Sequence, residues 1–267
     1  MLAFANAKIN LGLHVTEKRP DGYHNLETVF YPAKIHDVVE ITDAVETNCV
    51  TKGIEIPGDN TDNICLRTYE LLKKDYDLPA QQITLLKNIP IGAGLGGGSA
   101  DAAFLIRLLN TKFELGLSVA AMQGYARKLG ADCAFFIENT PVYATGKGDE
   151  FSSLTIDLSP YFMVLVKPPV HVSTADAYAG LKPVMPAIPL KELISLPIAD
   201  WKLHLKNDFE KHVFVKYPEI AQIKDELYAS GATFALMSGS GSSVYAIFES
   251  PLTLPELEKS NKVFYNI

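Results

Sequence analysis

A glycine-rich segment that runs directly into an apolar helix constrains this chain more than any other feature. Residues 89–99 read Ile-Pro-Ile-Gly-Ala-Gly-Leu-Gly-Gly-Gly-Ser, and residues 99–109 are apolar on most sides. Because glycine has no side chain, successive backbone N–H groups can turn towards one anion. The start of a helix adds unpaired N–H groups and the positive end of the helix dipole. The segment therefore predicts a site for the phosphates of a nucleotide.

Three other interpretations of this segment fit less well. A flexible turn would be weakened by so many glycines without any gain. Gly92-x-Gly94-x-x-Gly97 matches the dinucleotide fingerprint, but Pro90 separates it from the preceding strand, and no strand ending in an acid follows at about 20 residues. The Gly-Lys-Ser/Thr of a Walker A loop is missing. The segment thus indicates nucleotide binding of another design, with a dehydrogenase as the weakest alternative.

Apolar periodicity predicts a mixture of helices and strands, which is the α+β class. Strands are expected over residues 3–15, 29–41, 82–86, 160–166, 234–237 and 244–248, and helices over 64–74, 99–109, 119–129, 209–215 and 219–230. The Pro-rich residues 182–197 are expected to form a loop. Asp101 would lie in the first turn of its helix, where complementing the helix dipole is favoured over a metal or substrate role.

Composition and charge exclude several classes of protein. The 267 residues include 24 Lys and Arg against 31 Asp and Glu, so the formal charge is −7, and no basic run indicates nucleic-acid binding. Cys49, Cys65 and Cys133 are scattered, which argues against disulfides or a zinc site, and Cys133 is expected to be a buried structural thiol. No apolar run approaches the roughly 18 residues of a membrane span, and the N-terminus does not resemble a signal peptide. We expect a soluble cytoplasmic protein without nucleic-acid or membrane partners.

Three ordered motifs resemble those of a known family. Residues 90–103, Pro-Ile-Gly-Ala-Gly-Leu-Gly-Gly-Gly-Ser-Ala-Asp-Ala-Ala, resemble the phosphate loop of the GHMP kinases, and residues 5–11 and 237–243 are similar to that family's first and third motifs. The resemblance implies a domain of the ribosomal-protein S5 domain 2 type over residues 1–152 and a ferredoxin-like domain over residues 153–267. It also implies transfer of the γ-phosphoryl group of ATP to an alcohol, with Mg²⁺.

The resemblance assigns roles to residues of these motifs. Nucleotide contacts are implied for Pro90, Gly92, Gly94, Leu95, Gly96, Gly97, Gly98, Ser99, Ala100, Gly239 and Ser240, with Ser99 also a candidate for Mg²⁺. Asp132 is implied as the catalytic carboxylate and Lys8 as its partner, because a nearby ammonium keeps such a carboxylate ionised. From the residues alone, Lys8 is also compatible with a strand edge facing water, and Asp132 with a helix N-cap. Adenine contacts are expected in residues 60–67 and near Lys87.

One branch of the family matches more closely. Residues 19–28, Arg-Pro-Asp-Gly-Tyr-His-Asn-Leu-Glu-Thr, are similar to a signature of the GHMP kinases that phosphorylate the 2-hydroxyl of 4-diphosphocytidyl-2-C-methyl-D-erythritol in non-mevalonate isoprenoid biosynthesis. Tyr23 and His24 are expected to recognise the cytosine, since a base can stack on aromatic rings, although ordinary loop packing is the plain alternative. Asn10 is a candidate for orienting the polar groups of this substrate or Lys8, and Thr174, Asp176 and Tyr178 are candidates for contacts on its erythritol-phosphate side.

Two alternative functions stay open. The first is another GHMP kinase, which would act on mevalonate, homoserine or a sugar. The Asp-Gly-Tyr-His segment argues against it, because those substrates carry no base to stack. The second is a non-catalytic nucleotide-binding module, which would have lost Lys8 or Asp132, whereas both are present. A monomer or a weak homodimer is expected.

Overall fold

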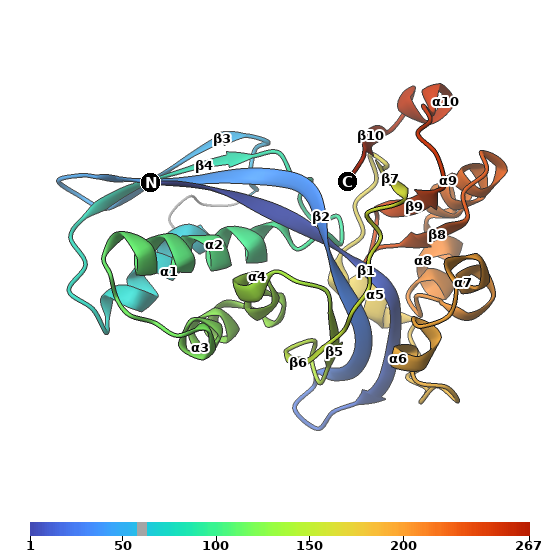
Figure 1. The fold of residues 1–267 in the computed structure, drawn as a ribbon, viewed down its shortest axis with the longest axis horizontal. Coiled ribbons are helices and arrows are strands. Elements are labelled where there is room, and N and C mark those ends of the chain that lie inside the picture. The colour runs from blue at the N-terminus through green and yellow to red at the C-terminus, as the bar shows by residue number, and fades with distance from the viewer. Residues whose placement is uncertain (58–62) are drawn as a thin grey trace. The chain divides into compact units, whose positions relative to one another are not determined.

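The helices and strands fall into two units. The computed structural model describes residues 1–57 and 63–267 (Figure 1). The first unit holds residues 1–7, 34–91 and 96–140, and the second holds residues 8–33, 92–95 and 141–267. Two long strands, β1 (Leu2–Lys18) and β2 (His24–Asp43), pair with each other and contribute residues to both units. The α+β class that the sequence predicts is confirmed.

The first unit combines a mixed sheet with a group of helices. Strand β4 (Gln81–Lys87) pairs in parallel with β3 (Asn48–Gly53) and antiparallel with the end of β2. Its helices are α1 (Ile64–Lys73), α2 (Gly97–Lys112), α3 (Val119–Leu129) and α4 (Phe135–Glu138). Helix α2 packs against the other three and is buried on most sides, as its apolar sequence predicts.

The second unit contains an antiparallel sheet with the strand order β10-β7-β9-β8. These strands are β7 (Phe162–Lys167), β8 (Phe234–Met237), β9 (Val244–Phe248) and β10 (Lys262–Tyr265). The start of β2 pairs with β5 (Val142–Thr145), which pairs with β6 (Glu150–Ser153). The helices are α5 (Thr174–Ala179), α6 (Leu190–Leu193), α7 (Ile198–His204), α8 (Glu210–Lys216), α9 (Pro218–Ala229) and α10 (Pro255–Glu258).

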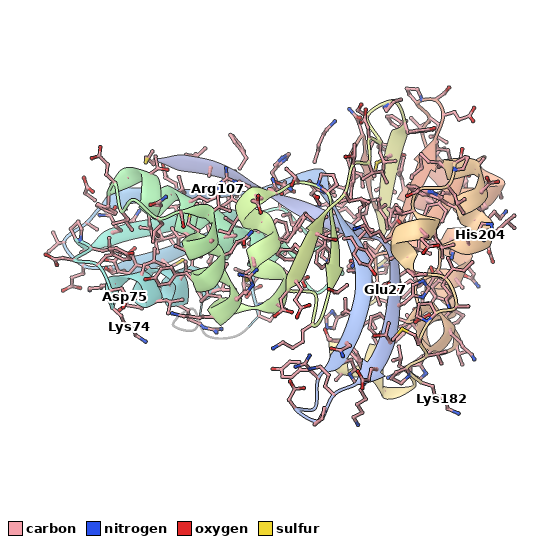
Figure 2. All side chains as sticks on the ribbon, turned by 60° about the horizontal axis from the view of Figure 1, so that its bottom comes forward. Glu27, Lys74, Asp75, Arg107, Lys182 and His204 are labelled. Atoms are coloured by element: carbon pink, nitrogen blue, oxygen red, sulfur yellow. The ribbon has the colours of Figure 1, made fainter. Side chains whose placement is uncertain are left out.

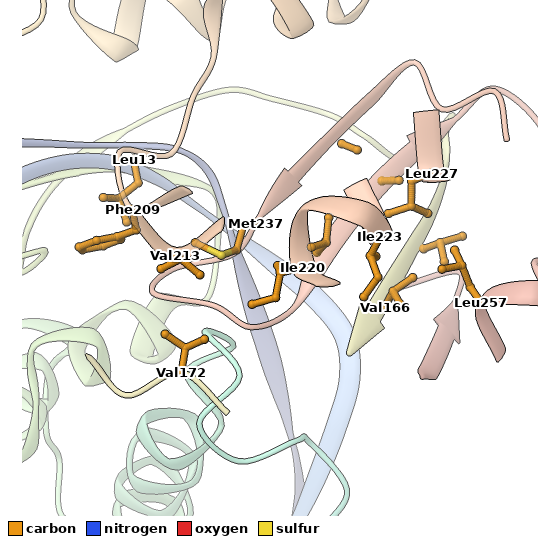
Figure 3. Close-up of a cluster of buried hydrophobic side chains, with 14 of the residues drawn as sticks. Leu13, Val166, Val172, Phe209, Val213, Ile220, Ile223, Leu227, Met237 and Leu257 are labelled. Carbon is orange, nitrogen blue, oxygen red and sulfur yellow. The ribbon is translucent and has the colours of Figure 1, made fainter. Parts of the chain in front are cut away.

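A buried apolar cluster forms the core of the second unit (Figure 3). Ile220, Ile223 and Leu227 recur at the spacing of one helix face in α9. They belong to the same cluster as Val166 of β7 and residues of β8 and β9. Leu13 of β1 joins this cluster, so the strand that carries the first motif is anchored in it.

Charged side chains lie mostly at the surface of each unit (Figure 2). Lys74 and Asp75, just after α1, and Lys182 are exposed, whereas Glu27 is buried and accepts a hydrogen bond from the Tyr143 hydroxyl. Across residues 1–57 and 63–267, no helix combines the length and apolar character needed to cross a bilayer.

An ionic cluster is buried in the first unit, next to the start of the glycine loop. The Nζ of Lys87 donates to Asp37 and, over 2.8 Å, to Asp101. The other carboxylate oxygen of Asp37 accepts the backbone N–H groups of Asn88 and Ile89 at 2.6 and 2.9 Å. One lysine therefore connects the residues that lead into the loop with the helix that follows it.

The position of Asp101 corrects the prediction made from the sequence. Helix α2 begins at Gly97, two residues earlier than expected, so Asp101 lies beyond the first turn, and its carboxylate pairs with Lys87 instead of complementing the dipole. Burial raises the pKa of Asp101 to about 7, with Lys87 opposing this shift and Asp37 adding to it. The pKa of Lys87 is raised, because the attraction of the two carboxylates exceeds the opposing effect of its burial.

We predict that Lys87→Leu destabilises the protein strongly. Removing the ammonium leaves Asp37 and Asp101 buried without their partner, and breaking a buried ion pair in this way costs about 3–5 kcal/mol. Urea denaturation measures the change in the free energy of unfolding. Lys259→Leu is the matched control, because the side chains of Lys259 and its partner Glu256 are 67% and 78% exposed, and such surface pairs contribute about 1 kcal/mol or less. Equal losses in the two variants would contradict a special role for the buried cluster.

Candidate active site

The glycine loop adopts backbone conformations that ordinary residues avoid. Gly92, Gly94 and Gly96 have φ values of +60°, +75° and +68°, a region that glycine enters without steric cost. The two side chains between them, Ala93 and Leu95, are buried and hold the loop in place. Gly96 is the N-cap of α2 and provides no side-chain cap. The first N–H groups of this helix are therefore suited to an external acceptor such as a phosphate oxygen.

The remaining predicted phosphate-loop residues surround the start of α2. Pro90 and Ala100 are buried, and the Ala100 N–H donates to the carbonyl of Gly96 over 2.9 Å. A Cβ atom on Gly97 would lie 2.9 Å from the Ile89 side chain, so the helix approaches the strand end closely. Gly98 is exposed, with no atom within 4 Å of the place where its Cβ would stand. The loop thus has a packed side and an open side.

The third motif packs directly against the loop at Gly94, within the second unit. The Ser238 hydroxyl donates to the carbonyl of Gly94 over 2.8 Å, and a Cβ on Gly94 would stand 2.0 Å from the carbonyl oxygen of Ser238. A Cβ on Gly239 would stand 3.1 Å from the carbonyl of Gly94 and 3.4 Å from Asn10 Oδ1. Ser240 follows and is half-buried. The structure therefore brings the predicted Gly94, Gly239 and Asn10 together, and adds Ser238.

Lys8 and Asn10 lie on β1 in this same unit. Lys8 is 4% exposed, so the alternative of a strand edge facing water is wrong. Its Nζ donates to Asn10 Oδ1 over 2.6 Å and lies 4.9 Å from the centre of the Phe30 ring, while Asn10 donates to the Thr28 hydroxyl. The backbone N–H of Lys8 donates to the carbonyl of Leu95 over 2.9 Å. The predicted catalytic lysine is thus held beside the glycine loop.

Asp132 belongs to the first unit, in a 3-10 turn over residues 131–134. It lies inside this turn, whose N-cap is the preceding glycine, so it is not the helix cap that the sequence left open. The adjacent Cys133 is hydrogen-bonded to the Ser99 side chain, and burial raises the pKa of its thiol to about 11, which confirms a buried, protonated thiol. These contacts bring Asp132 close to the start of α2. Its pairing with Lys8, which belongs to the other unit, stays a prediction.

A tight turn presents Tyr23 in the second unit. The Arg19 N–H donates to the Tyr23 carbonyl over 2.8 Å, and the Asp21 carboxylate accepts the Tyr23 N–H over 3.1 Å. The hydrogen bond from the Arg19 guanidinium lowers the pKa of Asp21 and keeps it ionised. The Tyr23 side chain is 61% exposed, and the ammonium of Lys147 lies 4.9 Å from its ring centre. The turn therefore offers an exposed aromatic ring.

His24 and Tyr178, which are far apart in the sequence, stack on each other. Their ring centres are 4.8 Å apart and the rings are inclined by 29°. Phe209 meets the Tyr178 ring edge-on, also at 4.8 Å. Burial and the charge of Lys18 lower the pKa of His24, so its imidazole is neutral near pH 7. Thr174, which is predicted with Tyr178 for the erythritol-phosphate side, begins α5 and is exposed.

Residues 60–67 are expected to contact adenine, and residues 60–62 of this region lie outside the described ranges. Asn63 follows and caps α1 by accepting the Cys65 N–H over 2.8 Å. Lys87, the other expected neighbour of adenine, holds its ammonium between two carboxylates. Contacts with adenine therefore stay predictions.

A metal site built from the protein alone is not found in the described ranges, 1–57 and 63–267. No group of three or more His, Cys, Asp or Glu side chains there could hold a metal ion. Mg²⁺ usually keeps several waters and binds through one or two carboxylates together with substrate phosphates. Ser99, the residue predicted to contact Mg²⁺, lies in the first turn of α2, and its contact with the ion stays a prediction.

We predict that Gly94→Ala weakens nucleotide binding. The added Cβ would overlap the carbonyl of Ser238 and displace the third motif from the loop. We expect the Kd of AMP-PNP, measured by calorimetry, to rise about tenfold, which corresponds to about 1.4 kcal/mol. Gly124→Ala is the matched control, because no atom lies within 4 Å of its Cβ position in α3 and alanine favours a helix by about 0.5–1 kcal/mol. Unchanged affinity in Gly94→Ala would refute the steric argument.

Sequence comparisons place both halves of the chain in one family. The model for the GHMP kinases N terminal domain matches residues 63–139, and the model for the GHMP kinases C terminal matches residues 190–264. A protein of Bacteroides fragilis named 4-diphosphocytidyl-2-C-methyl-D-erythritol kinase is 52% identical over 264 residues, which cover 97% of this chain and 96% of the relative. A protein of Cytophaga hutchinsonii with the same name is 51% identical, covering 98% and 96%.

Two solved structures are similar to this chain over nearly its full length. A crystal structure of 4-(cytidine 5'-diphospho)-2C-methyl-D-erythritol kinase is 29% identical, with a TM-score of 0.84 over 99% of this chain and 98% of that one. A homoserine kinase from Cytophaga hutchinsonii, 16% identical with a TM-score of 0.66 over 98% and 94% of the two chains, shares the fold. With near-complete coverage, both family models and all three motifs in place, the chain belongs to the GHMP kinase family.

Proposed function

We propose that the protein is an ATP-dependent kinase that phosphorylates the 2-hydroxyl of 4-diphosphocytidyl-2-C-methyl-D-erythritol, a step of non-mevalonate isoprenoid biosynthesis. The observation that carries this proposal is the agreement, over almost the whole chain, with relatives about half identical that bear the corresponding name. The stacked His24 and Tyr178 rings support it independently, since a base-bearing substrate needs an aromatic surface and mevalonate or homoserine does not.

The glycine loop would hold the phosphates of ATP. Phosphoryl transfer has a loose transition state, so the enzyme contributes mainly positioning and stabilisation of charge. The N–H groups at the start of α2 would donate to phosphate oxygens, and the closely packed Gly94 and Gly239 would keep the loop in one conformation. When bound, Mg²⁺ would neutralise part of the phosphate charge, with Ser99 as its candidate protein ligand.

Asp132 and Lys8 would act on the accepting hydroxyl. The Asp132 carboxylate would take the proton of the 2-hydroxyl while the hydroxyl oxygen bonds to the γ-phosphorus and the bond to ADP breaks. The ammonium of Lys8, oriented by Asn10, would stabilise the negative charge that develops. Tyr23, His24 and Tyr178 would bind the cytosine, and Thr174 would contribute on the erythritol side. We further propose that the enzyme acts in the cytoplasm as a monomer or weak homodimer.

A coupled assay of ADP release tests the proposed substrate. The purified protein is supplied with Mg-ATP and, in separate reactions, with 4-diphosphocytidyl-2-C-methyl-D-erythritol, mevalonate, homoserine or galactose. We expect turnover with the cytidyl substrate alone, and competition by CDP against it. Turnover with one of the other three alcohols would reassign the protein within its family. Nucleotide binding without turnover of any alcohol would favour a non-catalytic module.

We predict that Asp132→Ala and Lys8→Ala each lower kcat by about two to four powers of ten, the range that general acid–base groups contribute. Circular dichroism and the thermal unfolding midpoint establish whether each variant is folded. Asp200→Ala and Lys182→Ala are the matched controls, because both side chains are exposed, and their kcat should equal that of the parent. A folded Asp132→Ala variant with near-normal turnover would remove this residue from the mechanism.

A further inference from the structure

The segment Asn207–Glu210, which follows α7 and ends at the first residue of α8, lies against the strand that carries the first motif. Asn207 forms an isolated parallel bridge with Leu13 of β1, and the Asp208 N–H donates to the Leu13 carbonyl over 2.9 Å. The Asp208 carboxylate accepts the N–H of Val15 over 2.9 Å. The segment is therefore fixed to β1 by its backbone and by the Asp208 side chain. The side chains of its other three residues contact other parts of the second unit.

Asn207 binds the backbone of the third motif. Its Nδ2 donates to the carbonyls of Met237 and Gly239 over 2.8 and 2.7 Å, and its Oδ1 accepts the N–H of Phe209 over 3.0 Å. Asn207 is 2% exposed, so these carbonyls would lack solvent as a replacement partner. The side-chain amide of Asn207 thus binds both the last residue of β8, Met237, and the first glycine of the turn that follows it, Gly239.

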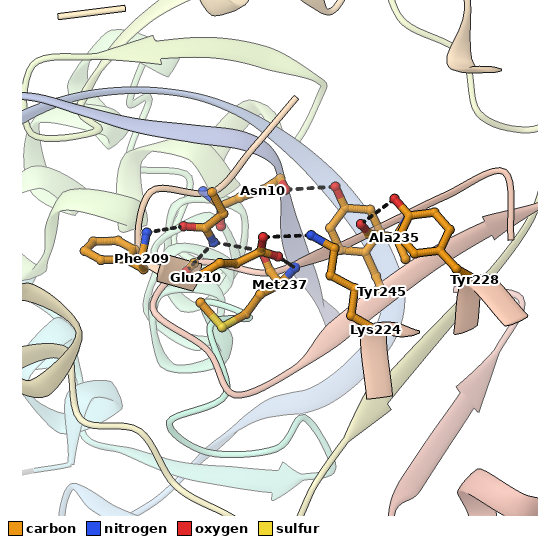
Figure 4. A network of polar contacts seen from close by, with 10 residues as sticks. Asn10, Phe209, Glu210, Lys224, Tyr228, Ala235, Met237 and Tyr245 are labelled. Atoms are coloured by element: carbon orange, nitrogen blue, oxygen red, sulfur yellow. Dashed lines mark hydrogen bonds and ion pairs between the residues drawn. The ribbon is translucent and has the colours of Figure 1, made fainter. Parts of the chain in front are cut away.

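Glu210 binds the N–H of Met237, the same residue whose carbonyl Asn207 binds. Its carboxylate accepts the N–H of Met237 over 2.9 Å and the ammonium of Lys224 over 2.7 Å (Figure 4). Burial raises the pKa of Glu210, while Lys224 acts in the opposite direction and favours the ionised form. The N–H and the carbonyl of Met237 are therefore both bound by side chains of one short segment.

Phe209 connects this segment to the aromatic pair. Its ring meets Tyr178 edge-on at 4.8 Å, and Tyr178 in turn stacks on His24 at 4.8 Å. The Phe209 side chain is buried in the core of the second unit, which fixes its position. Removing this ring would take away one of the contacts that orient Tyr178.

We infer that Asn207 and Phe209 are positioning residues that serve two different substrates from one segment. Asn207 holds the glycine turn against Gly94, and so shapes the nucleotide side of the site. Phe209 orients Tyr178, and so shapes the surface for the cytosine. The inference rests on the proposed function for the identity of the second substrate, whereas its nucleotide half does not depend on that identity.

The test separates the two sides by their kinetics and by binding. In Asn207→Ala, we expect the KM of ATP and the Kd of AMP-PNP to rise about tenfold, because the two hydrogen bonds to the third motif are lost. We expect the KM of the cytidyl substrate to rise less, through the loss of the acceptor for the Phe209 N–H. In Phe209→Leu, we expect the KM of the cytidyl substrate and the Kd of CDP to rise about three- to tenfold, the range of an aromatic pair, with the ATP values unchanged. Asn207→Ser, which keeps one donor, replaces the alanine variant if that variant does not fold.

Controls distinguish positioning from a loss of stability. Asn261→Ala removes an amide that donates to the Leu257 carbonyl over 2.8 Å, and it should leave all four constants unchanged. All measurements are made well below the thermal midpoint of each variant. The inference is overturned if Asn207→Ala and Phe209→Leu change the KM and Kd values of both ligands equally, or if they change none of these values. If the parent protein binds AMP-PNP but neither binds CDP nor turns over the cytidyl substrate, the proposed function fails, and the response of AMP-PNP binding to Asn207→Ala still decides the nucleotide half.

Discussion

Two backbone turns meet at Gly94 and Gly239 without any side chain between them, and the candidate site depends on this contact. A carbonyl of one turn occupies the space where a Cβ of the other would stand. Because the contact is so close, whatever fixes one turn also fixes the other. The Lys8 N–H binds the carbonyl of Leu95 from one direction, and Asn207 binds the carbonyl of Gly239 from another. The loop is therefore held by hydrogen bonds to its own carbonyl groups, those of Gly94 and Leu95.

The buried Lys87 stabilises the other end of the loop by a different physical means. Burying three ionisable groups is costly, and well-packed apolar residues are often as stable as a buried ion pair. An apolar replacement could not accept the N–H groups of Asn88 and Ile89, which Asp37 binds. The ionic cluster thus fixes the backbone at the residues where the loop begins. Hydrophobic contacts alone would not fix it, because they have no preferred direction.

Regular elements with strong periodicity could be predicted from the sequence. Helix α3 has the expected bounds, and α2 differs because Gly97 and Gly98 extend its start. Short elements were missed: α6 lies inside the predicted Pro-rich loop, and four residues carry too little pattern to identify a helix. The structure packs Gly239 of the third motif against Gly94, whereas the contacts of both glycines with a nucleotide stay a prediction. The roles of Asn207 and Asp101 could not be predicted, because each depends on a partner that only the folded chain brings near.

The long strand β1 has a consequence for how the chain is made. Residues 8–33 belong to the second unit, yet most of that unit consists of residues 141–267. Protein chains leave the ribosome from the N-terminus, so Leu13 and Val15 emerge long before the apolar cluster that covers them exists. During about half of its synthesis, the chain therefore lacks the residues that bury the apolar side chains of β1. The second unit therefore closes only after residues 141–267 have been made.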